Sequence, residues 1–261
     1  MEVYWLEQTV ADVPGDDAWL SPSEVSELRK RRFVKRRTDW LLGRWTAKNA
    51  AALYPVATRA PWALNEIEIR SAPSGAPEIF LGNVLAPIAI SMSHRAGIGA
   101  CAIAPSPYVI GCDLEIIEPH SNAFASDYFT SEEQKLVAKA AISDRAGLLT
   151  LLWSAKESAL KALHEGLRSD TRSVIVSLPE LLPRNGENNG TTLHWNPIQV
   201  CVINGPVFRG WWSQTGDLLR TVVGDPPSAP PVLLGRDVCL PLLNRIVRNG
   251  GSLATVASPQ R

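Results

Sequence analysis

Two short segments of the chain carry residue types that could bind a metal ion or a phosphate. In the sequence Gly-Cys-Asp-Leu-Glu, Asp113 and Glu115 are two positions apart, and alternate residues of a strand share one face. In the sequence Trp-Ser-Ala-Lys-Glu-Ser-Ala-Leu-Lys, Glu157 and Lys161 are four positions apart, which is about one helical turn. Three carboxylates beside a basic group suit a hard divalent cation bound to a phosphorylated substrate.

Each of these two segments, taken alone, also has a plainer explanation. A strand that faces solvent alternates polar and apolar residues, and Glu157 followed by Lys161 is the order that favours a surface ion pair worth about 0.3–0.5 kcal/mol. Gly111 shares the face of Asp113 and Glu115, where its missing side chain leaves room for a ligand to approach the backbone. Both explanations stay open on these two segments alone.

A third segment, Ser-Met-Ser-His-Arg-Ala-Gly, contains Ser93 and His94 and joins two predicted strands. The hydroxyls, the imidazole and the backbone N–H groups of such a turn can hold a phosphate. A single histidine in a turn is more often structural than a ligand. The segment therefore indicates a phosphate site only in combination with the two acidic segments.

Helix and strand signals place these segments on regular elements. Ser21 and Thr130 each precede a glutamate at the capping-box position, which predicts that helices begin there. A strand is predicted over 108–117 and a helix over 145–165, and these two elements carry the acidic segments. Other predicted elements are a helix from 22 to 54 with a break near Thr38, and strands at 3–10, 66–70, 78–81, 88–91, 97–104, 173–178, 192–195, 198–203, 207–212 and 219–223. Helices mixed with short strands predict an α+β fold.

The composition is that of an ordinary globular protein. Of the 261 residues, 45% are apolar and 20% are charged, and 26 basic residues balance 26 acidic ones. A neutral chain gives no argument for nucleic-acid or membrane binding. The four cysteines are widely spaced, so we expect free thiols, and the N-terminus has no secretory signal. The expected location is the cytoplasm.

Together the three segments carry a resemblance to a known family. S-x-S-H-x-x-G, then G-x-D-x-E, then W-S-x-K-E-x-x-x-K, in this order, resemble the 4′-phosphopantetheinyl transferase superfamily in its larger monomeric type, over roughly residues 41–178. The resemblance implies two similar subdomains, 1–106 and 107–224, related by a pseudo-two-fold axis with a ligand cleft between them. Residues 225–261 are expected to form a Pro-rich linker and a tail.

The resemblance also implies a reaction and its partners. The enzyme would transfer the 4′-phosphopantetheine arm of coenzyme A to a serine of an apo acyl- or peptidyl-carrier protein, releasing adenosine 3′,5′-bisphosphate. Asp113, Glu115 and Glu157 would bind Mg²⁺, or Mn²⁺ in its place. Lys161 would contact the pyrophosphate, and Glu157, directly or through a water, would accept the serine proton; which group is the base stays open. The protein would act as a monomer, without nucleic acid or membrane.

Five residues are implied to contact coenzyme A outside this metal site. Ser93 and His94 would lie near its phosphates. A basic run that ends at Arg37 lies in the predicted first helix, and Arg37, Arg44 and Lys48 are the candidates for binding the 3′-phosphate. The same run could instead be a solvated helix face or a nucleic-acid patch.

One position departs from the family pattern. The family commonly has Gly-Lys-Pro or Gly-Arg-Pro upstream of the S-x-S-H segment, and here Ala76 replaces the cation. This loss motivates a second hypothesis, a non-catalytic relative that binds coenzyme A or a carrier protein. A third hypothesis, a nucleic-acid-binding module, rests on the basic run alone.

Overall fold

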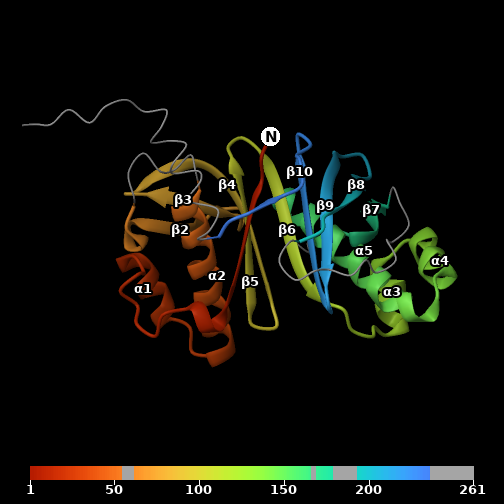
Figure 1. Cartoon of the computed structure of the whole chain (residues 1–261), viewed down its shortest axis with the longest axis horizontal. Coiled ribbons are helices and arrows are strands. Elements are labelled where there is room, and N and C mark those ends of the chain that lie inside the picture. Colours follow the sequence, from red (N-terminus) through yellow and green to blue (C-terminus); the bar gives the residue numbers. More distant parts are fainter. Residues whose placement is uncertain (55–61, 166–168, 179–192, 236–261) are drawn as a thin grey trace, which may run out of the picture.

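Two sheets, each packed against one long helix, form the part of the protein that the structure describes (Figure 1). The structure is a computed structural model, and it describes residues 1–54, 62–165, 169–178 and 193–235. Strands and helices are mixed along the chain, so the predicted α+β class is confirmed.

The first sheet has six strands in the order β11-β1-β5-β4-β3-β2. Its strands are β1 (Tyr4–Thr9), β2 (Ile67–Ser71), β3 (Pro77–Leu81), β4 (Val84–Arg95), β5 (Ile98–Pro105) and β11 (Val232–Leu233). Neighbouring strands are antiparallel, except that β11 pairs parallel with β1. Helices α1 (Pro22–Arg29) and α2 (Val34–Leu53) belong to this half, with the short 3₁₀ helices η1 (Val10–Asp12) and η2 (Leu64–Glu66). Three alanines of α2, Ala47, Ala50 and Ala51, pack against the isoleucines of the sheet.

The second sheet has five antiparallel strands in the order β6-β10-β9-β8-β7. Its strands are β6 (Val109–Ile116), β7 (Val174–Ser177), β8 (Asn196–Val202), β9 (Val207–Thr215) and β10 (Leu218–Asp225). Its helices are α3 (Asn122–Tyr128), α4 (Ser131–Lys139), α5 (Ile142–Ala162) and η4 (Thr171–Ser173). The apolar stripe of α5 is buried against this sheet, through Leu148, Leu152, Ala155 and Ala159. No helix in the described ranges is long and apolar enough to cross a membrane.

The two sheets meet through a third core and a few polar contacts. Trp5 and Ala102 of the first sheet share this core with Cys112 of the second. The backbone N–H of Cys112 donates to the Ser91 hydroxyl at 2.9 Å, and its thiol donates to the Ser91 carbonyl oxygen at 3.2 Å. These bonds fix strand β4 against strand β6, which carries the acidic pair.

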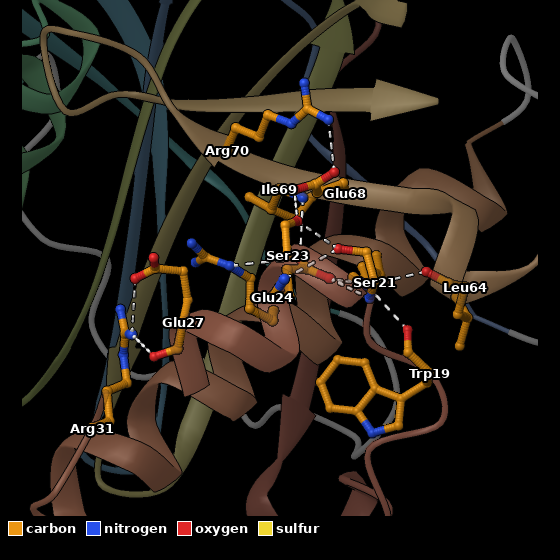
Figure 2. A network of polar contacts seen from close by, with 12 residues as sticks. Trp19, Ser21, Ser23, Glu24, Glu27, Arg31, Leu64, Glu68, Ile69 and Arg70 are labelled. Atoms are coloured by element: carbon orange, nitrogen blue, oxygen red, sulfur yellow. Dashed lines mark hydrogen bonds and ion pairs between the residues drawn. The ribbon is translucent and has the colours of Figure 1, made fainter. Parts of the chain in front are cut away.

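Glu24 of α1 is the centre of a polar network in the first half (Figure 2), and its ion pair with Lys48 ties α1 to α2. Glu24 forms the predicted capping box with Ser21 and also accepts the backbone N–H of Ile69 at 3.1 Å. Lys48 is fully buried, pairs with Glu24, and donates to the Trp19 carbonyl oxygen at 3.0 Å. Helix α1, helix α2 and strand β2 are thereby held together at one point.

The second half contains a pair with the same contacts. Glu133 forms the predicted capping box with Thr130 at the start of α4 and accepts the backbone N–H of Val176 at 3.2 Å. Lys156 of α5 is fully buried, lies 2.8 Å from Glu133, and donates to the Val174 carbonyl oxygen at 2.6 Å. Burial lowers the pKa of both this lysine and Lys48, and the paired glutamates oppose that shift.

Several predicted boundaries differ from the structure. The helix predicted from 22 to 54 is interrupted between Arg29 and Val34 rather than near Thr38, where Phe33 is extended and forms the N-cap of α2. Helix α3 was not predicted. The range 192–195 does not form the predicted strand in its described part, residues 193–195.

The C-terminal part of the chain also differs from the prediction. Residues 225–261 were expected to form a linker and tail, but Val232 and Leu233 form β11 and join the first sheet. Cys101, Cys112 and Cys201 are free thiols, as expected. Cys239 and the rest of the predicted tail lie outside the described residues.

Candidate active site

Strand β6 and helix α5 are in direct contact at the glycine of the acidic strand. A Cβ atom on Gly111 would stand 1.8 Å from the Ser158 carbonyl oxygen and 2.6 Å from the backbone nitrogen of Ala162. The space that the sequence suggested for a ligand is therefore taken by the backbone of α5. Because the glycine lets the two elements touch, the acidic residues of β6 lie beside those of α5.

Lys161 connects the two acidic segments. Its ammonium group lies 2.7 Å from Asp113 Oδ1 and donates to the Cys112 carbonyl oxygen at 3.0 Å. Its ion pair is thus with Asp113, and the surface pair with Glu157 that its spacing suggested is not the contact it makes. Burial alone would lower the pKa of Lys161, but the charge and hydrogen bond of Asp113, together with Cys112 and Glu157, outweigh it and the pKa is raised.

The three carboxylates lie close enough to repel one another. Asp113 Oδ2 and Glu157 Oε1 are both buried without a hydrogen-bond partner. Burial raises the pKa of Glu157, and the charge of Asp113 adds to that shift. Burial and then Asp113 likewise raise the pKa of Glu115. The arrangement leaves negative charge and lone pairs that a cation would satisfy.

Glu115 is held by two side chains, and the sequence did not predict that either of them would contact it. Trp153 Nε1 donates to Glu115 Oε1 at 3.2 Å, and Arg95 Nε lies 3.3 Å from Glu115 Oε2. Arg95 also pairs with Glu118. The only sequence signal for Arg95 is its position directly after the S-x-S-H motif, at the end of β4.

The S-x-S-H motif lies within strand β4 and not in a turn. The turn is formed by Ala96 and Gly97, and the motif is paired with β5 through Ser93 and His94. Its backbone is therefore engaged with β5 and does not form the N–H cradle that we predicted. The Ser93 hydroxyl donates to Asp113 Oδ1 at 2.8 Å, and His94 is exposed.

Asp113, Glu115 and Glu157 form what we call the carboxylate cluster. A cavity of about 440 Å³ lies next to it and is lined by residues of both halves. Its walls come from the start of α2, the β2–β3 turn, strand β4 and the end of α5. The lining residues include Arg31, Arg44, Ala76 and Lys161. A pocket of this size can hold a small-molecule ligand. Lys161 belongs to both the cavity wall and the carboxylate cluster, so the two form one continuous site.

Besides Lys161, the cavity is lined by the cations Arg31 and Arg44. Their guanidinium groups lie 4.5 and 4.8 Å from the ring centre of Trp40, which also lines the cavity. The Arg44 Nε atom is buried without a hydrogen-bond partner. The sequence predicted Arg44 but not Arg31, because Arg31 was indistinguishable from the other cations of the basic run.

The other two predicted phosphate contacts are not in this cavity. Arg37 is exposed on α2 and is not one of the lining residues. Lys48, for which we predicted a phosphate contact, is 0% exposed and bonded to Glu24, Trp19 and Leu64. Its charge is used to fix the fold.

The carboxylate cluster has the donor set for a hard cation. Its free oxygens are the buried atoms Asp113 Oδ2 and Glu157 Oε1, and oxygen donors are what Mg²⁺ takes. Asp113 Oδ1 and Glu115 are engaged by Lys161, Ser93 and Arg95. Within the described ranges, no three His, Cys, Asp or Glu side chains already form a metal cage. The residues fit a cation, and these ion pairs must rearrange to admit it.

Comparison with known proteins gives the family of the segment that contains this cluster. Residues 109–202 match the model of the 4′-phosphopantetheinyl transferase superfamily. A Synechocystis sp. protein that is provisionally named a 4′-phosphopantetheinyl transferase is 25% identical over 192 residues, which span 71% of this chain and 75% of that protein. The crystal structure of Thermotoga maritima holo-[acyl-carrier-protein] synthase aligns at 17% identity and a TM-score of 0.32, over 49% of this chain and 74% of that one.

Residues 109–202 are therefore similar to the 4′-phosphopantetheinyl transferase superfamily, the resemblance that the motifs of the chain predicted. The matched residues include Asp113, Glu115, Glu157 and Lys161, the four side chains that converge between β6 and α5.

Proposed function

We propose that this protein transfers the 4′-phosphopantetheine arm of coenzyme A to a serine hydroxyl of an apo acyl- or peptidyl-carrier protein. The reaction would depend on Mg²⁺, or on Mn²⁺ in its place, and would release adenosine 3′,5′-bisphosphate. The observation that carries the proposal is the continuity of the site. Lys161 lines a cavity that contains Arg31 and Arg44, and it is also bonded to Asp113 of the carboxylate cluster.

The arginine end of the cavity suits the nucleotide part of coenzyme A. Arg31 and Arg44 present guanidinium groups that can bind a phosphate in a bidentate manner. The ring of Trp40 lies beside both groups and offers an apolar face. Ala76 lines the same cavity, so the two arginines supply positive charge there although this position has lost its cation.

The Lys161 end of the cavity suits the pyrophosphate. Its ammonium group is fixed by Asp113 and by the Cys112 carbonyl oxygen, so it is a preorganised positive charge beside the site of reaction. Asp113, Glu115 and Glu157 would hold the divalent cation, which when bound neutralises charge on the phosphates. The Ser93 hydroxyl positions Asp113 from the opposite strand.

Glu157 is the candidate to accept the proton of the carrier serine. Its Oε1 atom is buried and has no hydrogen-bond partner, so a lone pair is available. Burial and the neighbouring Asp113 charge raise the pKa of Glu157, which makes it a better base than an exposed glutamate. Proton transfer through a water molecule is equally compatible with this position.

The test is incubation with coenzyme A, Mg²⁺ and an apo carrier protein, followed by measurement of the carrier's mass. We expect a gain of one phosphopantetheine group on the carrier, and no gain when a chelator removes the metal. A matched control uses a carrier whose acceptor serine is replaced by alanine. Binding of coenzyme A without modification of any of several carriers would reject the enzyme in favour of the non-catalytic hypothesis.

The arrangement of the halves is part of the same proposal. We propose that residues 1–106 and 107–224 are related by a pseudo-two-fold axis, with the coenzyme in the cleft between them. The matched contacts of Glu24 with Lys48 and of Glu133 with Lys156 support this relation. A monomer that works in the cytoplasm, without nucleic-acid or membrane partners, completes the proposal.

A further inference from the structure

Arg95 is a cation from the first sheet that reaches the carboxylate cluster of the second. It ends strand β4, and its Nε atom lies 3.3 Å from Glu115 Oε2. Its Nη2 atom bonds to Glu118, which lies just after β6 and is exposed. The guanidinium group therefore bridges one carboxylate inside the cluster and one outside it.

A second ion pair between the sheets is more deeply buried than the pair of Arg95 with Glu115. Arg220 of β10 bonds to Glu7 of β1, and the Arg220 side chain is only 6% exposed. Glu7 also accepts the Trp5 indole N–H at 2.7 Å. The Arg95 side chain is instead 42% exposed. Because exposed ion pairs are weak and exchange readily, Arg95 can leave Glu115 at little cost, whereas Arg220 is held in place.

Lys161 and Arg95 both pair with the carboxylate cluster, but they differ in where each makes its second bond. Lys161 has a second bond, to the Cys112 carbonyl oxygen, and its side chain is only 28% exposed. Arg95 has its second bond to Glu118, away from the cluster and toward solvent. A cation that enters the cluster can therefore displace Arg95 from Glu115 while Arg95 keeps its partner Glu118.

We propose that Arg95 is a resident counter-ion of this site, which holds Glu115 in the metal-free protein and is displaced toward Glu118 by the divalent cation. Arg95 would thus set the metal affinity of the site. This inference rests on the proposed function, because it takes Asp113, Glu115 and Glu157 as the metal ligands. It predicts that removing a positive side chain strengthens metal binding, since a competing charge is lost.

The experiment is a titration of the full-length protein with Mn²⁺, with free Mn²⁺ measured by electron paramagnetic resonance. We expect Arg95→Gln to lower the Kd for Mn²⁺ roughly three- to ten-fold, the range of a weak charge pair. Arg95→Lys, which keeps the charge, should stay within about two-fold of wild type. Arg172→Gln is the matched control, because Arg172 is an exposed arginine paired with Asp170.

Two outcomes distinguish this inference from the proposed function. If the wild type has no saturable Mn²⁺ site that Asp113→Asn removes, the metal part of the proposed function is wrong, and the inference with it. If that site is present but Arg95→Gln leaves its Kd unchanged or raises it, the counter-ion role is wrong and the proposed function stands. A thermal unfolding midpoint for each variant shows that the protein tested is folded.

Discussion

The long helices of the two halves, α2 and α5, share one structural contact and differ in the residues next to it. The sequence Trp-Thr-Ala-Lys-Asn around Lys48 corresponds to Trp-Ser-Ala-Lys-Glu around Lys156, and both lysines are buried against the glutamate of a capping box. The next residue is Asn49 in α2 and Glu157 in α5. The lysine therefore serves the fold in both halves, and the residue after it is a point at which the proposed site differs from its counterpart in the first half.

The difference continues one turn further along each helix. Four residues after Asn49 comes Leu53, which packs against the first core, whereas four residues after Glu157 comes Lys161. Among the residues that the structure describes, the second half thus places a carboxylate and a cation against an acidic strand, and α2 does not. The first half contributes the arginines of the cavity instead. Similar frameworks that carry different side chains thus form the two parts of the proposed site.

The largest effect on the reaction rate should come from replacing the residue that follows the buried lysine in α5. Glu157→Gln removes the candidate base and one candidate metal ligand, so the rate of phosphopantetheine incorporation should fall on the order of a thousand-fold. Asn49→Ala at the matching position of α2 should stay within about two-fold of wild type, because among the described residues the Asn49 amide donates to the Trp45 carbonyl oxygen of its own helix. Equal losses of incorporation rate in both variants would contradict the proposal that α5, and not α2, carries the catalytic carboxylate.

The shared lysines should affect stability by similar amounts. Lys48→Met and Lys156→Met each remove the lysine partner of a buried glutamate, which should lower the free energy of unfolding by about 3–5 kcal/mol. The loss should be the smaller one for Lys48→Met, because Arg44 Nε still lies 3.8 Å from Glu24 Oε1. Urea denaturation followed by tryptophan fluorescence measures this loss. If Lys48→Met were as stable as wild type but bound coenzyme A weakly, Lys48 would be a ligand contact after all.

The cavity arginines should separate binding from chemistry. Arg31→Gln and Arg44→Gln should each raise the KM for coenzyme A roughly ten-fold with little change in kcat, because each removes a charge-assisted phosphate contact. Arg37→Gln is the control, since Arg37 is exposed outside the cavity, and its KM should change less than about two-fold. A larger effect for Arg37 than for Arg31 would place the nucleotide elsewhere.

The smallest effect concerns a titratable group of the second half. His120 is stacked on Phe124 and hydrogen-bonded to Thr150 at 3.0 Å, and burial lowers its pKa below 6.5. The folded protein therefore binds this proton less readily than the unfolded chain does, so stability should decrease as the pH falls below about 6.5. In His120→Gln this slope of unfolding free energy against pH should be shallower. An unchanged slope would mean that His120 does not contribute.

Local signals in the sequence predicted much of the fold. The capping boxes at Ser21 and Thr130 gave the correct starts of α1 and α4, since the cap and its glutamate are three residues apart. Strand alternation placed Asp113 and Glu115 on one face of β6, and helix spacing placed Glu157 and Lys161 on the same side of α5.

Contacts between distant residues could not be predicted in the same way. A buried lysine is unusual, and Lys48 is buried only because Glu24, far away in the chain, is there to pair with it. The sequence suggested room for a ligand at Gly111, which is wrong, because a strand pattern does not say that a helix backbone fills this space. Arg31 entered the cavity because the chain bends between α1 and α2, a change of direction that the run of basic residues did not specify.

The two bonds between Cys112 and Ser91 have a practical consequence. The Cys112 thiol is buried between the sheets and burial raises its pKa, so it can react with a thiol reagent only when β4 and β6 separate. The half-buried Cys201, outside that junction, offers an internal reference for the same reagent. The labelling rate of Cys112 would thus measure how often the two sheets separate. A ligand that spans the cavity should lower this rate.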